Sequence, residues 1–412
     1  MRAHAFPLRF LVALALVCAG VLIGSPAAAQ EAEDPFEAAR FRLGPIRFTP
    51  AIKLTNLGMD SNVFNESEDP KSDNTAAFGP EVALWMRPLG TRLSGKFGVQ
   101  YLYFQEYDNQ RSWNTANEAR WEVPLARLTP FVAGTYVNSS DRHGYEIDSR
   151  ARRHDDSYTI GSSLAFSGKT SILASFTRAN AEYDDAESLG DLQLARALNR
   201  REDTTKVQLR YELTPLTTFV VDTDFGRDRF NNTDLRNADG LRVMPGFELK
   251  PAALISGRVF VGYRRFEPLN ENLPEYNGVA AAVDAAYIRN STRFQARVER
   301  DVEYSFEPLR PYYALTDIGV TVTQRMLTSW ELVARGGHQR LDYRQLSATG
   351  AAVDAGKPDV GYIAGAGIGY RVGEILRLGV DTNYYTRRSE FEGRRDYEGL
   401  RVFGSIVYGI QQ

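Results

Sequence analysis

Strict alternation of apolar and polar residues in Lys206–Leu213 constrains the fold of this chain more than any other feature. The apolar positions are Val207, Leu209, Tyr211 and Leu213. Successive side chains of a β-strand point to opposite faces, whereas a helix requires a period of about 3.6. Thr214 and Pro215 interrupt the run, and a second alternating run follows at 217–230. The stretch therefore predicts a β-hairpin whose strands each have one apolar and one polar face.

The same unit recurs from about Ile46 to the last residues. We expect eighteen strands, with sixteen as the alternative because 75–87 and 113–123 are the least regular runs. The expected strands are 46–57, 75–87, 91–107, 113–123, 128–140, 153–166, 169–183, 203–213, 217–230, 238–249, 253–266, 277–288, 292–304, 312–324, 329–343, 359–371, 375–387 and 397–410. Tight connections such as Thr214–Leu216 alternate with long ones such as Asp184–Glu202. Outer-membrane barrels alternate in this way and soluble sandwiches have no reason to, so we predict an all-β, closed transmembrane antiparallel β-barrel.

Aromatic residues gather near the ends of the expected strands. By the tight turns they are Trp121, Phe166, Phe219, Phe247, Tyr287, Phe294, Trp330 and Tyr370. Toward the long loops they are Tyr103, Tyr183, Phe225, Tyr263, Tyr304 and Tyr384. Such positions are typical of the two aromatic girdles of a membrane barrel, whereas a sandwich core would place aromatic residues near strand centres.

The first residues have the three parts of a secretory signal peptide. Arg2 and Arg9 are basic, Phe10–Gly24 is apolar, and Ala27–Ala29 offers a small-residue cleavage site. Cleavage after Ala29 would remove residues 1–29, including Cys18, the one cysteine of the chain. A periplasmic N-terminal lead at 30–45 and an outer-membrane barrel at 46–412 would remain, without disulfides or thiolate metal sites. We expect the outer membrane of a Gram-negative bacterium as the location.

Three short stretches resemble the opening of a known family of bacterial outer-membrane proteins. They are Gly58–Phe64, Ser72–Asp73 and Phe78–Val82, and the family is the putative β-barrel porin-2 family. Its members are often found with exopolysaccharide or capsule synthesis and export systems. The apolar face of the last strand, Leu400, Val402, Gly404, Ile406, Tyr408 and Ile410, is similar to the C-terminal signal read by the barrel-assembly machinery.

The resemblance implies a set of partners. They are outer-membrane lipid and lipopolysaccharide, the barrel-assembly machinery, a polysaccharide cargo and periplasmic export components. The formal net charge is −3 and no block of lysine and arginine occurs, so nothing indicates nucleic-acid binding.

Candidate residues for catalysis or metal binding are few. His143 and His154 flank a loop with Asp155 and Asp156 nearby, which is a possible metal site, and His338 could serve a hydrolase in the barrel wall. Loop histidines beside acids are usually only solvated, and no serine and acid can be assigned to His338. We therefore expect no catalytic residue, no metal and no cofactor.

Two further features concern the passage through the barrel. Gly361, Gly365, Gly367 and Gly369 share the lumen face of one strand, which predicts a groove where another segment or a cargo approaches the backbone. In the loop Asp184–Glu202 apolar residues recur every three positions, which fits a short helix. They are Leu189, Leu192, Ala195 and Leu198. Such a helix could pack against the barrel mouth and constrict it, and the alternative is a mobile surface loop.

Alternation also assigns charges to the lumen. The basic candidates are Arg258, Arg264, Arg293, Arg297, Arg335, Arg377 and Arg387, and the acidic ones on the strand 217–230 are Asp222, Asp224 and Asp228. Fixed cations in a narrow passage would favour an anionic cargo, such as an acidic polymer. The alternative is that acids on the same faces, such as Asp284, Asp301, Glu331 and Asp381, neutralise the arginines across strands.

Eighteen strands enclose an aqueous passage. The leading hypothesis is a passive conduit for exopolysaccharide secretion, as the resemblance implies. A general or small-solute porin is the alternative within transport. A barrel-embedded enzyme and a structural or adhesive surface protein are alternatives from other classes.

Overall fold

The computed structural model describes residues 34–143, 146–147, 149–345, 353–354, 357–389 and 396–409. The expected signal peptide, its cleavage site and Ile410 lie outside these residues. The long strands are β2 (Ile46–Asp60), β3 (Asp73–Met86), β4 (Arg92–Phe104), β5 (Ser112–Glu122), β6 (Leu128–Asp141), β7 (Ala151–Ala165), β8 (Thr170–Tyr183), β11 (Arg200–Thr214), β12 (Thr217–Phe230), β13 (Ala238–Leu249), β14 (Ile255–Pro268), β15 (Tyr276–Arg289), β16 (Thr292–Tyr304), β17 (Tyr312–Met326), β18 (Trp330–Gln345), β20 (Asp359–Val372), β21 (Leu376–Arg388) and β22 (Tyr397–Tyr408).

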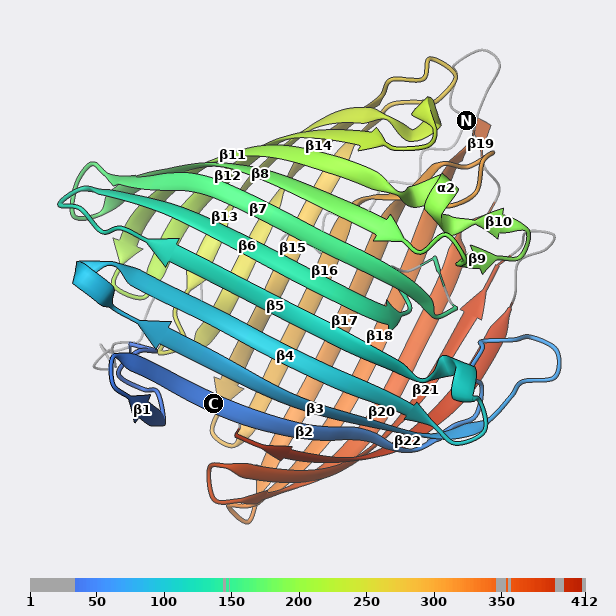
Figure 1. Ribbon diagram of the computed structural model, residues 1–412, viewed down its shortest axis with the longest axis horizontal. Coiled ribbons are helices and arrows are strands. Elements are labelled where there is room, and N and C mark those ends of the chain that lie inside the picture. The colour runs from blue at the N-terminus through green and yellow to red at the C-terminus, as the bar shows by residue number, and fades with distance from the viewer. Residues whose placement is uncertain are drawn as a thin grey trace. The chain divides into compact units, whose positions relative to one another are not determined.

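These strands form one closed antiparallel barrel in which each strand pairs with its neighbour in the chain (Figure 1). The sheet has twenty strands including the short β1 and β19, which leaves eighteen in the wall. Closure comes from pairing of β2 with β22, from Ile52 opposite Tyr408 to Asp60 opposite Arg401. The predicted fold and strand number are therefore confirmed, and the sixteen-strand alternative is wrong.

The period of two explains which face of each strand meets which solvent. Val207 and Leu209 of β11 are exposed on the outside of the barrel. Lys206, the residue before Val207, points into the barrel and pairs with Asp224 of β12 at 3.4 Å. An apolar outer band and a polar interior suit lipid outside and water inside, and closure leaves no unpaired edge in the bilayer.

Two of the expected girdle residues do not lie on the outer surface. Tyr183 is 4% exposed and packs inside the barrel with Phe230. Tyr304 contacts the same ring edge to face, at 4.8 Å between centroids. Along β8 the outward residue Phe176 has even parity, so Tyr183 has the parity of the lumen. For Tyr183, the position near a strand end suggested the wrong face, and parity gives the right one. Tyr304 has the even parity of the outward residue Phe294 of β16, so parity does not explain its inward position.

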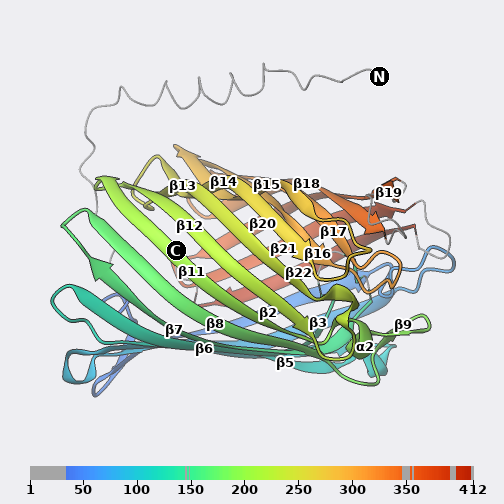
Figure 2. The same cartoon turned by 90° about the horizontal axis from the view of Figure 1, so that it is seen from above.

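Short elements decorate the two ends of the barrel. β1 (Phe41–Leu43) lies in the expected aperiodic lead and pairs with the start of β2 through a turn at Gly44, whose φ is +57°. β9 (Ser188–Leu189), β10 (Leu192–Gln193) and α2 (Leu194–Leu198) lie between β8 and β11, and β19 (Val353–Asp354) pairs with the end of β18. β9 and β19 lie at the same end (Figure 2). No helix among the described residues is long and apolar enough to cross a membrane.

Candidate functional site

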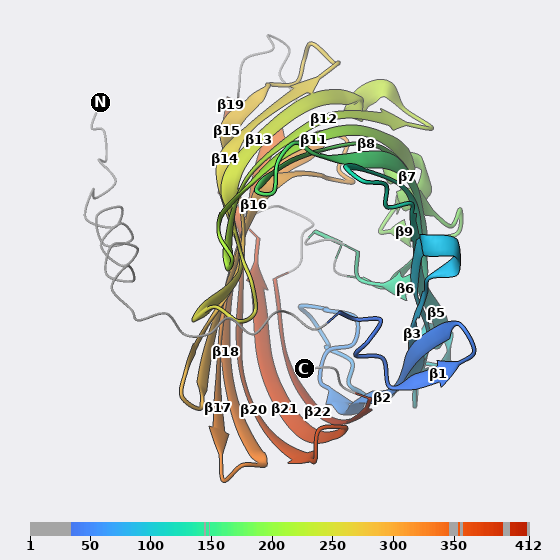
Figure 3. The same cartoon turned by 90° about the vertical axis from the view of Figure 1, so that its left-hand side faces the viewer.

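The connection between β6 and β7 runs inside the barrel. Its Glu146 is 4% exposed and accepts hydrogen bonds from Ser305 Oγ at 2.7 Å and Phe306 N at 3.0 Å, both in the connection between β16 and β17. Arg387 Nη1 of β21 donates to the Glu146 carbonyl oxygen at 3.0 Å. Six wall strands separate β7 from β16, and eight separate β6 from β17 in the other direction. The β6–β7 connection therefore reaches across the lumen, as Figure 3 shows.

Both ends of the β6–β7 connection are fastened. Arg142 Nη2 donates to the Val63 carbonyl oxygen at 2.5 Å, and Arg150 Nη2 donates to Ser112 Oγ at 3.0 Å. His143 Nε2 lies 2.9 Å from the carbonyl oxygen of Ala151. Burial lowers the pKa of Arg150 to about 10, and burial together with the charge of Arg153 lowers the pKa of His143. A neutral His143 donates to Ala151 from Nε2.

The loop end of the β16–β17 hairpin also leaves the wall. Pairing of β15 with β16 ends at Ala281 opposite Arg300. Beyond that point Asp301 pairs with Arg242 of β13 at 2.8 Å, and the Tyr304 hydroxyl donates to Asp228 of β12 at 2.7 Å. These partners lie three and four strands away along the wall. The hairpin end therefore lies over the inner face of its neighbours.

A buried arginine holds this hairpin end. Arg236 belongs to η4 (Asp234–Arg236), between β12 and β13, and is 3% exposed. Its Nε donates to the Ser305 carbonyl oxygen at 2.8 Å, and its Nη2 donates to that of Phe306 at 2.9 Å. Burial lowers its pKa to about 10, while the charge of Glu146 opposes that shift. Three connections of the barrel thus meet at Ser305 and Phe306.

The helix α2 packs on this junction. Leu194 is 0% exposed, and it forms one cluster with Ile147 of the β6–β7 connection and with Phe230 of the wall. Of the residues expected to constrict the mouth, Ala195 and Leu198 are buried in that cluster and Leu189 packs against it. Leu192 lies in β10, opposite Leu189 of β9. The short helix expected in Asp184–Glu202 is therefore present, with its apolar side against the β6–β7 connection.

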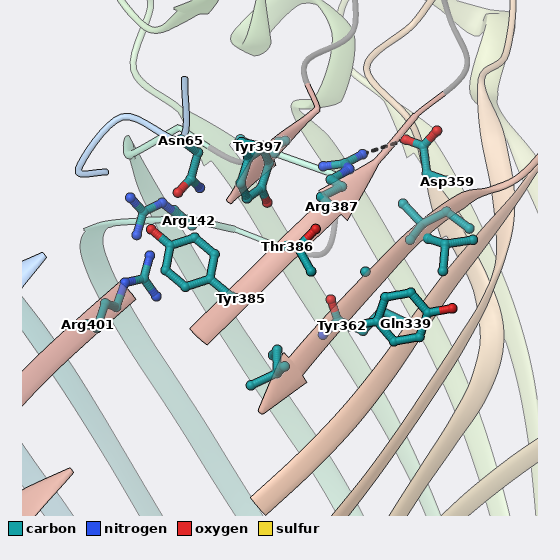
Figure 4. A pocket seen from close by; sticks show the side chains of 15 residues that line it. Asn65, Arg142, Gln339, Asp359, Tyr362, Tyr385, Thr386, Arg387, Tyr397 and Arg401 are labelled. Carbon is teal, nitrogen blue, oxygen red and sulfur yellow. Dashed lines mark hydrogen bonds and ion pairs between the residues drawn. The ribbon is translucent and has the colours of Figure 1, made fainter. Parts of the chain in front are cut away.

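A cavity of about 280 Å³ lies beside the junction. Its described lining includes three arginines, Arg142, Arg387 and Arg401, and one acid, Asp359 (Figure 4). Arg387 pairs with Asp359 at 2.7 Å, and the Arg401 guanidinium lies 4.0 Å from the centre of the Tyr385 ring. Burial lowers the pKa of Arg142, and the charge of Arg401 lowers it further. Most of its described lining is therefore neutral, and the charged part consists of these three arginines and Asp359.

The stretch Gly58–Phe64 positions two of these arginines. Asp60 accepts from Arg401 Nε at 2.9 Å and from the Tyr385 hydroxyl at 3.2 Å. Asn62 is buried and donates through Nδ2 to the carbonyl oxygens of Glu66 and Glu398, and the Val63 carbonyl oxygen accepts from Arg142. The residues that carried the family resemblance thus join the β2–β3 connection to β21, β22 and the β6–β7 connection.

The lumen charges expected from alternation are mostly paired. The pairs are Arg264 with Asp301 at 3.5 Å, Arg297 with Glu299 at 2.9 Å, Arg335 with Asp381 at 2.5 Å, Arg377 with Glu331 at 3.0 Å and Arg387 with Asp359 at 2.7 Å. Asp222 accepts from Gln208, Asp224 pairs with Arg242, and Asp228 accepts from Tyr304. Within the described residues, Arg258 and Arg293 have no ion-pair partner. The wall thus carries neutralised pairs and no continuous basic stripe.

The glycine row of β20 is not an open groove. A Cβ on Gly365 would overlap Asn383 Oδ1 and lie 2.9 Å from Arg335 Cγ, and one on Gly369 would lie 2.8 Å from Arg377 Nη2. Gly361 faces Gln339 and Gly367 faces Asp381 in the same way. Side chains of β18 and β21 therefore fill the space above the glycines, where we expected a cargo or another segment.

The histidines do not converge. His143 lies against Tyr183 inside the barrel, whereas His154 has the parity of the outward residues Tyr158 and Ile160 and contacts Tyr136. His338 packs on Tyr362, with 5.1 Å between ring centroids. No group of three or more metal-binding side chains occurs within the part of the chain that the structure describes.

Sequence patterns did not reveal the residues that join the connections inside the barrel. Arg142, Glu146 and Arg236 lie in connections, where no periodicity assigns a face. The one available signal was Ile147, an apolar residue in a polar loop. Its burial against α2 fastens that loop inside the barrel.

Among solved structures, Pseudomonas aeruginosa OccK2 (OpdF) superposes with a TM-score of 0.51 at 9% identity, covering 88% of this chain and 97% of that one. The structure of OccK2 in complex with glucuronate gives 0.50 at 10% identity, covering 88% and 98%. At such identities the likeness shows the fold alone. No curated protein matches the sequence. The model of the Putative beta-barrel porin 2 family matches residues 34–408. The resemblance of Gly58–Val82 is thereby confirmed, and this chain belongs to the Putative beta-barrel porin 2 family.

Proposed function

We propose that this outer-membrane, porin-like barrel is a passive channel for small hydrophilic solutes. The observation that carries the proposal is the β6–β7 connection, whose Glu146 is bonded to Ser305 and to Arg387 on distant parts of the wall. A barrel of eighteen strands encloses an aqueous passage. A segment fastened across that passage narrows it, which supports a channel for small molecules over one for a polymer.

A narrowed passage argues against the leading hypothesis from the sequence. A polysaccharide moving through the lumen would have to displace the β6–β7 connection and break the buried bonds of Glu146 and Arg236. The comparisons give no support to exopolysaccharide secretion, and membership of a porin family fits the small-solute alternative better. We propose no catalytic reaction, which is compatible with a family of porin-like barrels.

The remaining expectations belong to this proposal. A signal peptide cleaved after Ala29 would deliver the chain to the periplasm, and the barrel-assembly machinery would insert it among lipid and lipopolysaccharide. The packing of α2 on the β6–β7 connection supports the proposal that Ala195 and Leu198 help to hold the constriction.

Reconstitution of the mature chain in liposomes tests the function. Swelling rates in neutral sugars should fall steeply from monosaccharides to oligosaccharides, because the passage sorts solutes by size. The control is the same barrel denatured by boiling, which should run at a different gel mobility and give no swelling. Equal rates for mono- and oligosaccharides, or no swelling from a folded barrel, would contradict the proposal. Loss of surface polysaccharide in a deletion strain would instead support a role in exopolysaccharide secretion.

A further inference from the structure

A hollow lies in the outer face of the barrel over β5 to β8, which run side by side (Figure 1). Gly134 of β6 pairs with Ala119 of β5 and with Tyr158 of β7, so two small residues form the floor of the hollow. Its walls are apolar side chains exposed on the outside of the barrel: Trp121, Val132, Tyr158, Ile160 and Phe176. The hollow measures about 600 Å³, within the range of ligand pockets at roughly 300–1,000 Å³. It therefore offers a shaped surface to an apolar chain from the membrane.

The row of cross-strand partners that crosses the hollow continues into a group of arginines. Beyond Tyr158 the row contains Arg178 of β8, Asp203 of β11 and Arg227 of β12. Arg178 also lines the hollow, and its Nε and Nη2 donate to the two Asp203 oxygens at 2.7 and 3.1 Å. Arg201 of β11 lies 3.5 Å from the same carboxylate. Arg178, Arg201 and Arg227, here called the arginine group, thus surround one acid on the β8 side of the hollow.

The arginine group retains the capacity to bind an anion after its acids are counted. From β7 to β13 this row and the next one hold four arginines and three acids: Arg178, Arg201, Arg227 and Arg229, with Asp156, Asp203 and Asp239. Asp156 accepts from Asn180 at 3.0 Å and Asp239 pairs with Arg229 at 2.7 Å. Arg227 is exposed and has no ion-pair partner among the described residues. A guanidinium has five N–H donors, of which Asp203 takes two from Arg178.

The arginine group lies where the apolar outer face ends. Toward the loop end of the barrel, exposed Phe176 is followed by Arg178 on β8, and exposed Phe225 by Arg227 on β12. The long connection between β8 and β11 begins beyond these residues. Long connections of outer-membrane barrels face the outside of the cell, so the group lies at the level of the headgroups of the outer leaflet.

We propose that the hollow and the arginine group bind one molecule of lipid A, the phosphorylated and acylated glycolipid of the outer leaflet. An acyl chain would fill the hollow over Gly134, and a phosphate would lie on Arg227 and Arg201. Arginine binds phosphate oxygens through two parallel hydrogen bonds, and basic sites on membrane proteins bind lipid headgroups. The site faces lipid and does not depend on what passes through the lumen.

Diphosphoryl lipid A and its dephosphorylated form are a matched pair of probes, because they differ only in the phosphates. Each is titrated against the full mature barrel in detergent micelles, and the bound complex is counted by native mass spectrometry. The diphosphoryl form should bind more tightly, and Arg227→Gln should raise its Kd about tenfold, the loss expected for a hydrogen bond to a charged group. Gly134→Val should weaken the binding of both lipids by filling the hollow, since a Cβ at this position makes only ordinary contacts with the protein.

Arg340→Gln is the control variant, because it removes an exposed arginine from β18, outside the hollow and the arginine group. It should shift the Kd by less than about twofold, because distant charges are screened. A difference in gel mobility between unheated and boiled samples shows that each variant is folded. Equal affinity for the two forms of lipid A, or equal shifts in Arg227→Gln and Arg340→Gln, would overturn the proposal. Phosphatidylglycerol or inorganic phosphate that binds as tightly as lipid A would overturn the assignment to the outer-leaflet glycolipid.

Discussion

Arg335 of β18 donates to Asp381 of β21 at 2.5 Å, although β20 lies between their strands. The pair passes over Gly365 and Gly367, which present no side chain to the lumen. Glu331 and Arg377 are joined across the same strand at 3.0 Å. The glycine row of β20 therefore allows its two neighbours to be linked directly, and ion pairs tie three strands together.

Replacing Gly365 with alanine should destabilise the barrel, because the new Cβ would overlap Asn383 Oδ1 and crowd Arg335. We expect a loss of about 1–3 kcal/mol, as for other overpacked sites. Urea unfolding in lipid vesicles measures it. Gly226→Ala is the matched control, since a Cβ there meets open space on the lumen face. Equal stabilities of the two variants would contradict the proposed fit of the side chains over β20.

Glu146→Ala should release the β6–β7 connection from Ser305 and Phe306. The buried Ser305 hydroxyl would lose its acceptor at a cost of about 1–3 kcal/mol, and the partly buried Phe306 N–H would lose its acceptor as well. We expect larger and noisier single-channel conductance than in the wild type. Glu118→Ala, which removes an exposed acid from β5, serves as control. Unchanged conductance in Glu146→Ala would mean that the connection does not limit the passage.

The packing of α2 predicts a second way to loosen the constriction. Leu194→Ala would leave a cavity between α2 and Ile147 and should cost about 2–5 kcal/mol of local stability. The conductance should then fluctuate between levels. Arg196→Ala, on the exposed side of the same helix, should leave recordings unchanged. If both variants behave like the wild type, α2 is a surface decoration without effect on the passage.

Acidification should loosen the β6–β7 connection through His143. Burial and Arg153 lower the pKa of the packed imidazole, while Asp155 and two backbone acceptors oppose the shift. As the pH falls through about 6.5, a released His143 takes up a proton more readily than a packed one, so the packed state loses stability. Channel noise should therefore increase between about pH 7.5 and about pH 5.

His143→Gln should abolish this response to pH, because glutamine can still donate to Ala151 but does not titrate in this range. His154→Gln should preserve it, since His154 lies on the outer face against Tyr136. A response that survives in His143→Gln would assign the titration to another group.

Strand positions were predictable because apolar and polar residues alternate with a period of two, a pattern that neighbouring residues show by themselves. The runs at 217–230, 238–249 and 292–304 coincide with β12, β13 and β16. The contacts between the connections inside the lumen were not predictable, because they join residues far apart in the chain. Glu146 and Ser305 are 159 positions apart, and no local pattern links them. Tyr183 is an intermediate case. The alternation along β8 predicts the lumen face for it, but its position near the strand end led us to expect the outer girdle.

The departure of the β16–β17 hairpin from the wall fixes a level for the membrane. Beyond Ala281 and Arg300 the side of β15 that faces β16 has no strand partner among the described residues, so the backbone of Tyr276–Ala280 is open on that side. Unpaired sheet edges do not occur in hydrocarbon. We therefore expect the boundary of the lipid at the loop end of the barrel to lie on the turn side of this notch, with the wall beyond it in water.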